Sequence, residues 1–182
     1  MSQVFVSGHK SPDTDSIAAA LSYSYLKRRL GMDAVAVRAG EINKESRFAL
    51  DYFDLEEPIL VTSVARKNPE DEKRKVILVD HNESKQTIDG MDDAEVLEII
   101  DHHRFGDFES ENPIFIFVRP VGCVNTVIYG LYKANHIKPS REIAGIMLSA
   151  IISDTVLFRS PTTTEEDKET AKELAEIAGV DY

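Results

Sequence analysis

Four short stretches of the chain carry clustered aspartate and histidine residues. They read GHKSPDTDS at 8–16, VDHNE at 79–83, IIDHHR at 99–104 and SDT at 153–155. Four carboxylates and two imidazoles form a mixed hard and borderline donor set, which suits manganese, cobalt, iron or zinc better than calcium. The candidate metal ligands are His9, Asp13, Asp15, Asp80, His102 and Asp154.

Four carboxylates gathered at one place cannot all stay ionised without positive charge nearby. Two divalent ions would balance the four carboxylates, whereas one ion would leave the site anionic. We therefore expect a binuclear centre. Two ions about 3.5–4 Å apart turn a shared water into a nucleophile at neutral pH and polarise the bond under attack, which is hydrolytic phosphoryl chemistry.

Short branched apolar runs alternate with segments of helical period along the chain. This pattern is typical of parallel strands with helices on their faces. It predicts an α/β fold, with a mostly parallel sheet of five to six strands and helices on both faces. The predicted strands are 4–8, 33–38, 58–62, 76–80, 96–101 and 114–120, and the predicted helices are 16–31, 43–53, 121–135, 141–153 and 163–179, the last beginning with a capping box from Thr163 to Glu166.

The polar stretches fall at the ends of these elements. The first three follow predicted strands, and ligands bind at the carboxyl ends of parallel strands because loops and helix N-termini converge there. The helix over 141–153 is apolar nearly all round, so it should be central. Asp154 follows it, where the negative end of the helix dipole favours a cation. All four stretches should therefore meet at one place.

Composition limits the class of protein. A formal net charge of −11 makes nucleic acid and anionic membranes poor partners, since the field repels both. With one cysteine and neither a signal peptide nor an apolar run of spanning length, the sequence predicts a cytoplasmic protein in a reducing compartment. With 182 residues and no linker or internal repeat, we expect one domain over 1–182.

The four stretches together resemble the motifs of the DHH phosphoesterase superfamily. The whole chain, including PVGC at 120–123 and LFRSPT at 157–162, is similar to the N-terminal domain of family II manganese-dependent inorganic pyrophosphatases. The resemblance implies hydrolysis of pyrophosphate to two phosphates with two Mn²⁺, Co²⁺ being an alternative and Mg²⁺ accompanying the substrate. It also implies that His9 and Asp13 bind one ion. Asp15, His102 and Asp154 would bind the other, with Asp80 as the bridge.

The same resemblance gives roles to neighbouring residues. His103 would contact the substrate and form the candidate catalytic pair with Asp101, which orients an imidazole through its other nitrogen. Lys10 and Arg104 are candidate phosphate contacts, as is Arg159 near the fourth stretch. Each of these cations also reads as an ordinary surface charge.

For two further residues, a structural role is favoured over a role in the site. His81 more often would be a hydrogen-bonded histidine than a site residue, and Cys123 a small packed residue rather than a nucleophile. The start of the helix at PVGCVNT could aim backbone N–H groups at a phosphate.

Details of the motifs favour pyrophosphatase over related activities. Pro12-Asp13-Thr14-Asp15 differs from the PDGD typical of nuclease-like members, and exopolyphosphatase-like relatives tend to replace the histidine found here at His9. The alternatives are a metal-binding dimerisation module without useful turnover and a related DHH phosphodiesterase or polyphosphatase.

The resemblance covers only one of the two domains of the family's enzymes. The smaller C-terminal domain, which closes over the site and brings lysine and arginine to the substrate, is missing from this chain, so we expect weak activity alone. The family also implies a homodimer through paired sheet edges, for which 114–120 is the candidate edge strand.

Overall fold

Six parallel strands form one sheet in the order β3-β2-β1-β4-β5-β6 in the computed structural model, which describes residues 3–182. The order reverses its direction between β1 and β4, so the crevice at their carboxyl ends is a topological switch point. The predicted α/β class and parallel sheet are confirmed. The strands are β1 Val4–Ser7, β2 Ala34–Arg38, β3 Ile59–Leu60, β4 Lys75–Val79, β5 Glu95–Asp101 and β6 Phe115–Val118.

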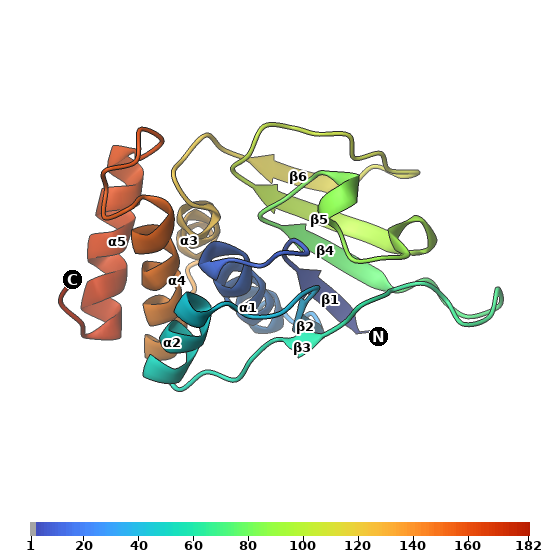
Figure 1. Cartoon of the computed structure of the whole chain (residues 1–182), viewed down its shortest axis with the longest axis horizontal. Helices are drawn as coiled ribbons and strands as arrows, with labels where there is room; N and C mark the ends of the chain where they lie inside the picture. Colours follow the sequence, from blue (N-terminus) through green and yellow to red (C-terminus); the bar gives the residue numbers. More distant parts are fainter. Residues whose placement is uncertain (1–2) are drawn as a thin grey trace.

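The α-helices lie together on one side of the sheet (Figure 1). They are α1 Thr14–Arg29, α2 Lys44–Tyr52, α3 Val124–Ala134, α4 Arg141–Asp154 and α5 Glu165–Ala178. Helix α1 packs directly on β1, β2 and β4, and α4 lies between α1 and α5. The central position predicted for α4 is confirmed, because a helix that is apolar nearly all round must be covered on most sides.

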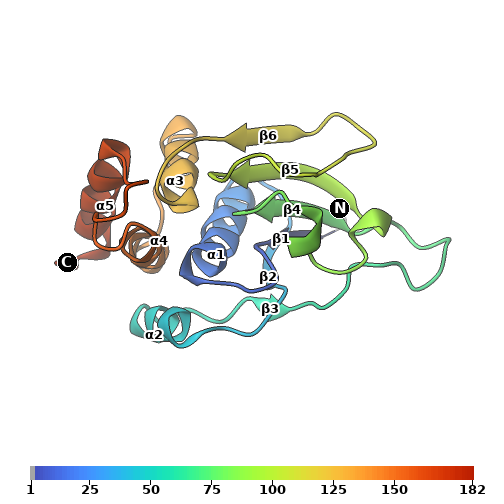
Figure 2. The ribbon, with the colours of Figure 1, turned by 45° about the horizontal axis from the view of Figure 1, so that its top comes forward.

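The second face of the sheet differs from the prediction of helices on both faces. The connections from β4 to β5 and from β5 to β6 cover it with loops and the two 3₁₀ turns η1 Ser84–Gln86 and η2 Met91–Asp93 (Figure 2). Right-handed crossovers change face where the strand order reverses, so these connections belong there. These connections are polar and charged along much of their length, and they form no α-helix. They cover the sheet with a few apolar side chains such as Ile88.

Element ends differ from the predicted ones in small ways. The capping box of α5 joins Thr164 and Asp167, one residue later than predicted, because the shorter aspartate reaches back to the Thr164 N–H. Strand β3 keeps only two of the five predicted residues. Within residues 3–182, no helix is long and apolar enough to cross a membrane.

A glycine in the middle of α4 sets the distance between α2 and α4. A Cβ added to Gly145 would lie 2.2 Å from Cε1 of the Phe53 ring, which is buried at the end of α2. The aromatic ring therefore packs directly on the α4 backbone. This contact fixes α4, which carries Asp154 at its last position.

Gly145→Ala should destabilise the fold by about 1–3 kcal/mol, because overpacking against Phe53 outweighs the better helix propensity of alanine. Gly130→Ala on α3 is the matched control. An added Cβ there meets no atom within 4 Å outside the adjacent backbone of its own helix, so that variant should gain roughly 0.5–1 kcal/mol. Chemical denaturation measures both. Equal effects of the two substitutions would contradict the close contact.

Candidate metal centre

The four aspartate and histidine stretches meet at the carboxyl ends of β1, β4 and β5. The β1–α1 connection supplies His9 and Asp13, and the first turn of α1 supplies Asp15. Asp80 and His102 directly follow β4 and β5. In Figure 2 the strand arrows point toward this end, where α3 approaches the sheet.

Asp80 lies at the centre of the cluster. Its Oδ2 is 3.4 Å from His9 Nε2, and its Oδ1 is 3.3 Å from His102 Nε2. The two oxygens of one carboxylate thus face two different imidazoles. This is the arrangement that a bridging ligand between two ions requires.

The other five candidate ligands form two groups around Asp80. His9 Nε2 lies 3.6 Å from Asp13 Oδ2. On the other side, His102 Nε2 lies 3.6 Å from Asp15 Oδ2 and 4.0 Å from Asp154 Oδ2. Asp13 therefore lies beside His9, whereas Asp15 and Asp154 lie beside His102.

The backbone at Asp80 is in the left-handed region, with φ of 62°. A non-glycine residue there costs on the order of 1–3 kcal/mol and persists only when its surroundings enforce it. The Asp80 N–H donates to the Ile100 carbonyl, so the β5 backbone holds the turn. This strain turns the side chain into the site directly after the last residue of β4.

The cluster holds more carboxylates than its own imidazoles can balance. Burial, together with the nearby Asp15 carboxylate, raises the pKa of Asp80 and raises that of Asp154 to about 11. Burial opposes protonation of His9 and His102, yet their aspartate contacts outweigh it and raise the pKa of each imidazole to about 10. The raised pKa values of the two carboxyls and of the two imidazoles have the same meaning: the site favours bound positive charge. This is the property of a site that binds cations.

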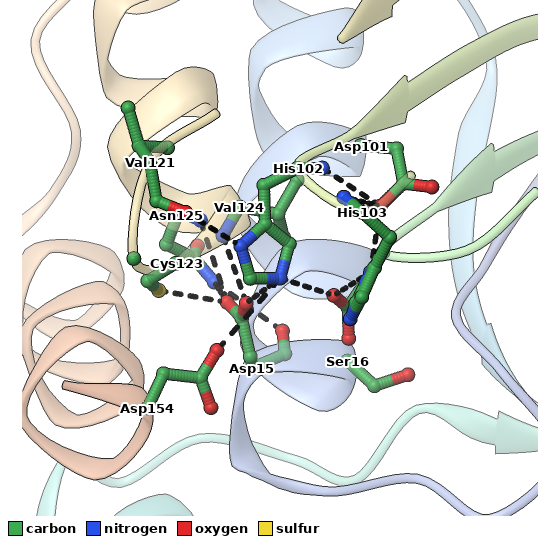
Figure 3. A network of polar contacts seen from close by, with 12 residues as sticks. Asp15, Ser16, Asp101, His102, His103, Val121, Cys123, Val124, Asn125 and Asp154 are labelled. Carbon is green, nitrogen blue, oxygen red and sulfur yellow. Dashed lines mark hydrogen bonds and ion pairs between the residues drawn. The ribbon is translucent and has the colours of Figure 1, made fainter. Parts of the chain in front are cut away.

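Asp15 is held by the N-terminal end of α3. Figure 3 shows its carboxylate facing Cys123, Val124 and Asn125, while His102 and Asp154 approach from other sides. The suggestion that this helix start binds a phosphate is wrong, because the Val124 and Asn125 N–H groups donate to Asp15. The Gly122 N–H, in turn, donates to the buried Asp167.

Asp101 organises the turn after β5. Its Oδ1 accepts from the backbone N–H groups of His102 and His103 and lies 2.9 Å from His103 Nδ1. Asn82 donates to its other oxygen. Burial raises the pKa of Asp101, but the bonds from His103 and Asn82 outweigh this and lower it, so the carboxyl stays ionised.

The candidate phosphate contacts are not gathered in the cluster. The Lys10 ammonium pairs with Asp89 at 2.5 Å, and the Arg104 side chain is 88% exposed. Arg159 is exposed on the turn after α4. Across residues 3–182, the ion-pair partners of the four clustered aspartates are all histidines.

His81 and Cys123 are both buried beside the cluster. The His81 ring lies edge-on to His9, with centroids 6.4 Å apart, and its Nδ1 is 2.9 Å from the Val79 carbonyl. Burial lowers the pKa of His81 to about 4, so the ring is neutral. Cys123 is not simply a packed side chain, since its Sγ donates to Asp15. Burial, followed by the Asp15 charge, raises the pKa of this thiol, which argues against a nucleophile.

Several residues that shape the site carry no sequence signal strong enough to single them out. Ser16 is one, since its hydroxyl accepts the His9 N–H at 2.9 Å. Asn82 is another, and its place inside the second polar stretch was the available hint. Asn125 lies in a helix that reads as apolar, and only the folded chain brings it to Asp15.

Divalent ions fit this set of residues. Asp80 is only 2% exposed and its Oδ1 accepts no hydrogen bond, so this oxygen has been taken from water without a neutral donor to replace it. Three groups of potential ligand atoms lie within 4.8 Å of one another, and the first two share Asp80: Asp80, His102 and His103; His9, Asp13 and Asp80; and Asp15, Cys123 and Asp154. Oxygen and imidazole ligands in this mixture suit manganese-like ions.

Known proteins match this chain over its whole length. Residues 3–151 match the DHH family, N-terminal domain. A protein of Exiguobacterium sp. named "Probable manganese-dependent inorganic pyrophosphatase" is 53% identical over 181 residues, covering 100% of this chain and 57% of the relative. The manganese-dependent inorganic pyrophosphatase of Bacillus subtilis is 50% identical with the same coverage.

A solved structure shows the same relation. The crystal structure of a candidate family II inorganic pyrophosphatase from Methanococcus jannaschii superposes with a TM-score of 0.88 and 42% identity, covering 99% of this chain and 58% of the other. This chain therefore spans little more than half the length of the proteins it resembles.

The charges of Asp80 and Asp101 should have opposite effects on the metal-free protein. Asp80→Asn should raise its stability by about 1 kcal/mol or more, roughly 2–4 °C in Tm, because burial and the nearby Asp15 carboxylate disfavour the charged form of Asp80. Asp101→Asn should lower it by about 1–3 kcal/mol, because buried hydrogen bonds to a charge are lost.

Manganese should reverse the order of the wild type and Asp80→Asn. At about 100 times its dissociation constant, an ion that binds only the folded state adds roughly 2.7 kcal/mol, a gain that Asp80→Asn should lose and Asp101→Asn should largely keep. Melting curves in chelator and in Mn²⁺ measure both terms. A lower Tm for metal-free Asp80→Asn would contradict the crowding of charge around that residue.

Proposed function

The chain belongs to the DHH family, with residues 3–151 matching its N-terminal domain, and on this premise we propose that it is the metal-binding part of a manganese-dependent inorganic pyrophosphatase. The proposed reaction is hydrolysis of pyrophosphate to two phosphates. The observation that carries it is the buried Asp80 carboxylate between the imidazoles of His9 and His102. A shared carboxylate of this kind serves two-ion hydrolysis of phosphate esters and anhydrides.

The ligands divide between two sites in this proposal. His9 and Asp13 would hold one Mn²⁺, Asp15, His102 and Asp154 the other, and Asp80 both. When bound, the ions would lower the pKa of water and polarise the phosphoryl group. Co²⁺ is the alternative metal, and Mg²⁺ would accompany the substrate.

His103 is the proposed contact to the substrate. Its side chain is 53% exposed, while its Nδ1 is anchored 2.9 Å from the buried Asp101 carboxylate. The hydrogen bond to Asp101 raises the pKa of His103, so the imidazole carries a proton more readily. Its Nε2 is left free of hydrogen bonds within residues 3–182 and can donate to a phosphate oxygen. Asp101 is thereby the proposed partner that orients the catalytic imidazole.

Further cations are needed for the charge of pyrophosphate. Four aspartates would balance two divalent ions, and the structure leaves Lys10 paired with Asp89 and Arg104 extended toward solvent. We propose that the part of the longer relatives that this chain does not match supplies cations to the substrate. This shortage of cations also supports the second candidate function, a metal-binding module without useful turnover.

A reducing, cytoplasmic location is part of the same proposal. The one cysteine, Cys123, is a buried free thiol. Such use of cysteine fits a compartment in which disulfides do not form.

We propose that two copies of the chain pair through β6. This strand is at the edge of the sheet, and Phe115 and Ile116 on it are 50% and 44% exposed. An edge with apolar side chains and free backbone groups can extend the sheet into a second copy, which a twofold axis would satisfy on both sides.

This chain should hydrolyse pyrophosphate in Mn²⁺ at least about a hundredfold more slowly than a full-length relative, because losing even one well-aimed cation typically costs about 10²–10³ in rate. Phosphate release gives kcat/KM for both, and Asp80→Asn serves as the inactive control. Comparable kcat/KM would show that the described residues already form a complete site. No release above the Asp80→Asn level, with two ions bound, would favour the module without turnover.

Ile116→Lys should dissociate a β6-paired dimer, since a charge on the edge would have to be buried in the pairing. Sedimentation should show a dimer for the wild type at micromolar concentration and a monomer for the variant. Ile59→Lys on β3, at the opposite edge and also exposed, is the control that should stay dimeric. A dimer that Ile59→Lys breaks and Ile116→Lys leaves intact would assign the interface to the other edge.

A further inference from the structure

We propose that Asn125, fixed in place by Ser22, is a positioning residue that leaves Asp15 only one oxygen with which to bind an ion. The inference rests on the function proposed above and adds a residue to it. Asn125 is on α3 and Ser22 is on α1, so neither lies in the four polar stretches.

The two oxygens of Asp15 have different surroundings. Oδ1 accepts from Asn125 Nδ2 at 2.7 Å, from Cys123 Sγ at 2.9 Å and from the Asn125 N–H at 3.3 Å. A carboxylate oxygen offers about two lone-pair directions, so Oδ1 has no capacity left for an ion. Oδ2 accepts only the Val124 N–H and lies 3.6 Å from His102 Nε2. The free direction of the carboxylate therefore points at His102 and the shared site.

Ser22 determines which end of the Asn125 amide meets Asp15. The Ser22 hydroxyl lies 2.9 Å from Asn125 Oδ1 and donates to it. The opposite end of the amide, Nδ2, then faces Asp15 and donates to its Oδ1 and to its carbonyl. An inverted amide would place two acceptors against each other and leave the serine proton without its partner.

All three residues of this relay are fully buried. Ser22, Asn125 and Asp15 each have 0% exposure. A buried hydroxyl and a buried amide cost free energy unless they are hydrogen-bonded, and apart from the hydroxyl's 3.4 Å contact with Ala19 O their side-chain bonds run only along this relay to Asp15. The Ser22 and Asn125 side chains therefore hold Asp15 in place.

Asp15 differs in this respect from the other clustered aspartates. Asp13 accepts one backbone N–H, from Ser16, and Asp80 Oδ1 accepts no hydrogen bond. The positive end of the α3 dipole also faces Asp15. The protein thus holds one ligand in place before any ion binds. Loss of the hydrogen bonds from Asn125 to Asp15 should affect mainly the ion shared by Asp15, His102 and Asp154.

The inference is tested by titrating Asn125→Ala with Mn²⁺. Calorimetry and the electron spin resonance signal of free Mn²⁺ measure the binding. We expect one of the two ions to bind about 10–100-fold more weakly, the usual effect of removing the partner of a metal ligand, and the other to change less than about twofold. Asn125→Asp, which turns an acceptor toward Asp15, should weaken the same ion at least as much. Ser22→Ala should give a smaller loss at the same ion, and adding it to Asn125→Ala should have no further effect, because Ser22 acts through Asn125.

Tyr132→Phe is the matched control. It removes a buried hydrogen bond from α3 to the Ser22 carbonyl of α1 without touching Asp15. It should lower Tm in chelator and leave both Mn²⁺ affinities unchanged. If Asn125→Ala fails to fold, Ser22→Ala alone carries the test.

Equal Mn²⁺ affinities in wild type, Asn125→Ala and Ser22→Ala, with a reduced Tm in chelator, would overturn the inference and leave a purely structural role. Equal weakening of both ions would also overturn it, because the relay reaches only Asp15. A wild-type chain that binds no Mn²⁺ would instead refute the proposed function, so the two failures are distinct.

Discussion

The carboxylate of Asp80 is buried between two imidazoles at the switch point of a parallel sheet, and the surrounding structure is arranged around this concentration of charge. Its backbone is strained into the left-handed region, where the β5 carbonyl of Ile100 holds it. Both oxygens face histidines, and three other aspartates approach within the same few ångströms. Such a cluster disfavours the folded state by itself, because its charges repel one another and are poorly hydrated. Its existence in an otherwise well-packed core indicates that cations complete the fold.

The protein compensates part of this charge with its own groups. The N-terminal end of α3 serves Asp15, and the bonds around Asp101 keep the turn after β5 in place. Neither set of bonds reaches Asp80 itself. A division of this kind is what a metal site requires: ligands that are oriented beforehand by neutral donors, around a central ligand that only cations can satisfy.

The same layout explains where the helices are. Helix α1 begins within the first polar stretch, and α4 ends at Asp154, so one helix start and one helix end converge on the crevice. The packing of α4 between α1 and α5 fixes that convergence, and the direct contact of Phe53 with Gly145 sets its position relative to α2. The exposed β6 edge lies on the side of the sheet away from β3. Pairing of two copies there would leave the crevice open to substrate.

The sequence by itself determined the fold class and the members of the cluster. Both follow from local patterns, since strands, helix periods and polar residues at strand ends are encoded by neighbours along the chain. Only the tertiary structure decided that the second face carries 3₁₀ turns, that Lys10 pairs with Asp89, and that Cys123 and Asn125 face Asp15. Asn125 lies 110 positions from Asp15 in an apolar helix, and its role depends on the amide geometry that Ser22 imposes. Contacts over such separations arise from how helices pack, and periodicity carries no information about which buried polar groups then meet.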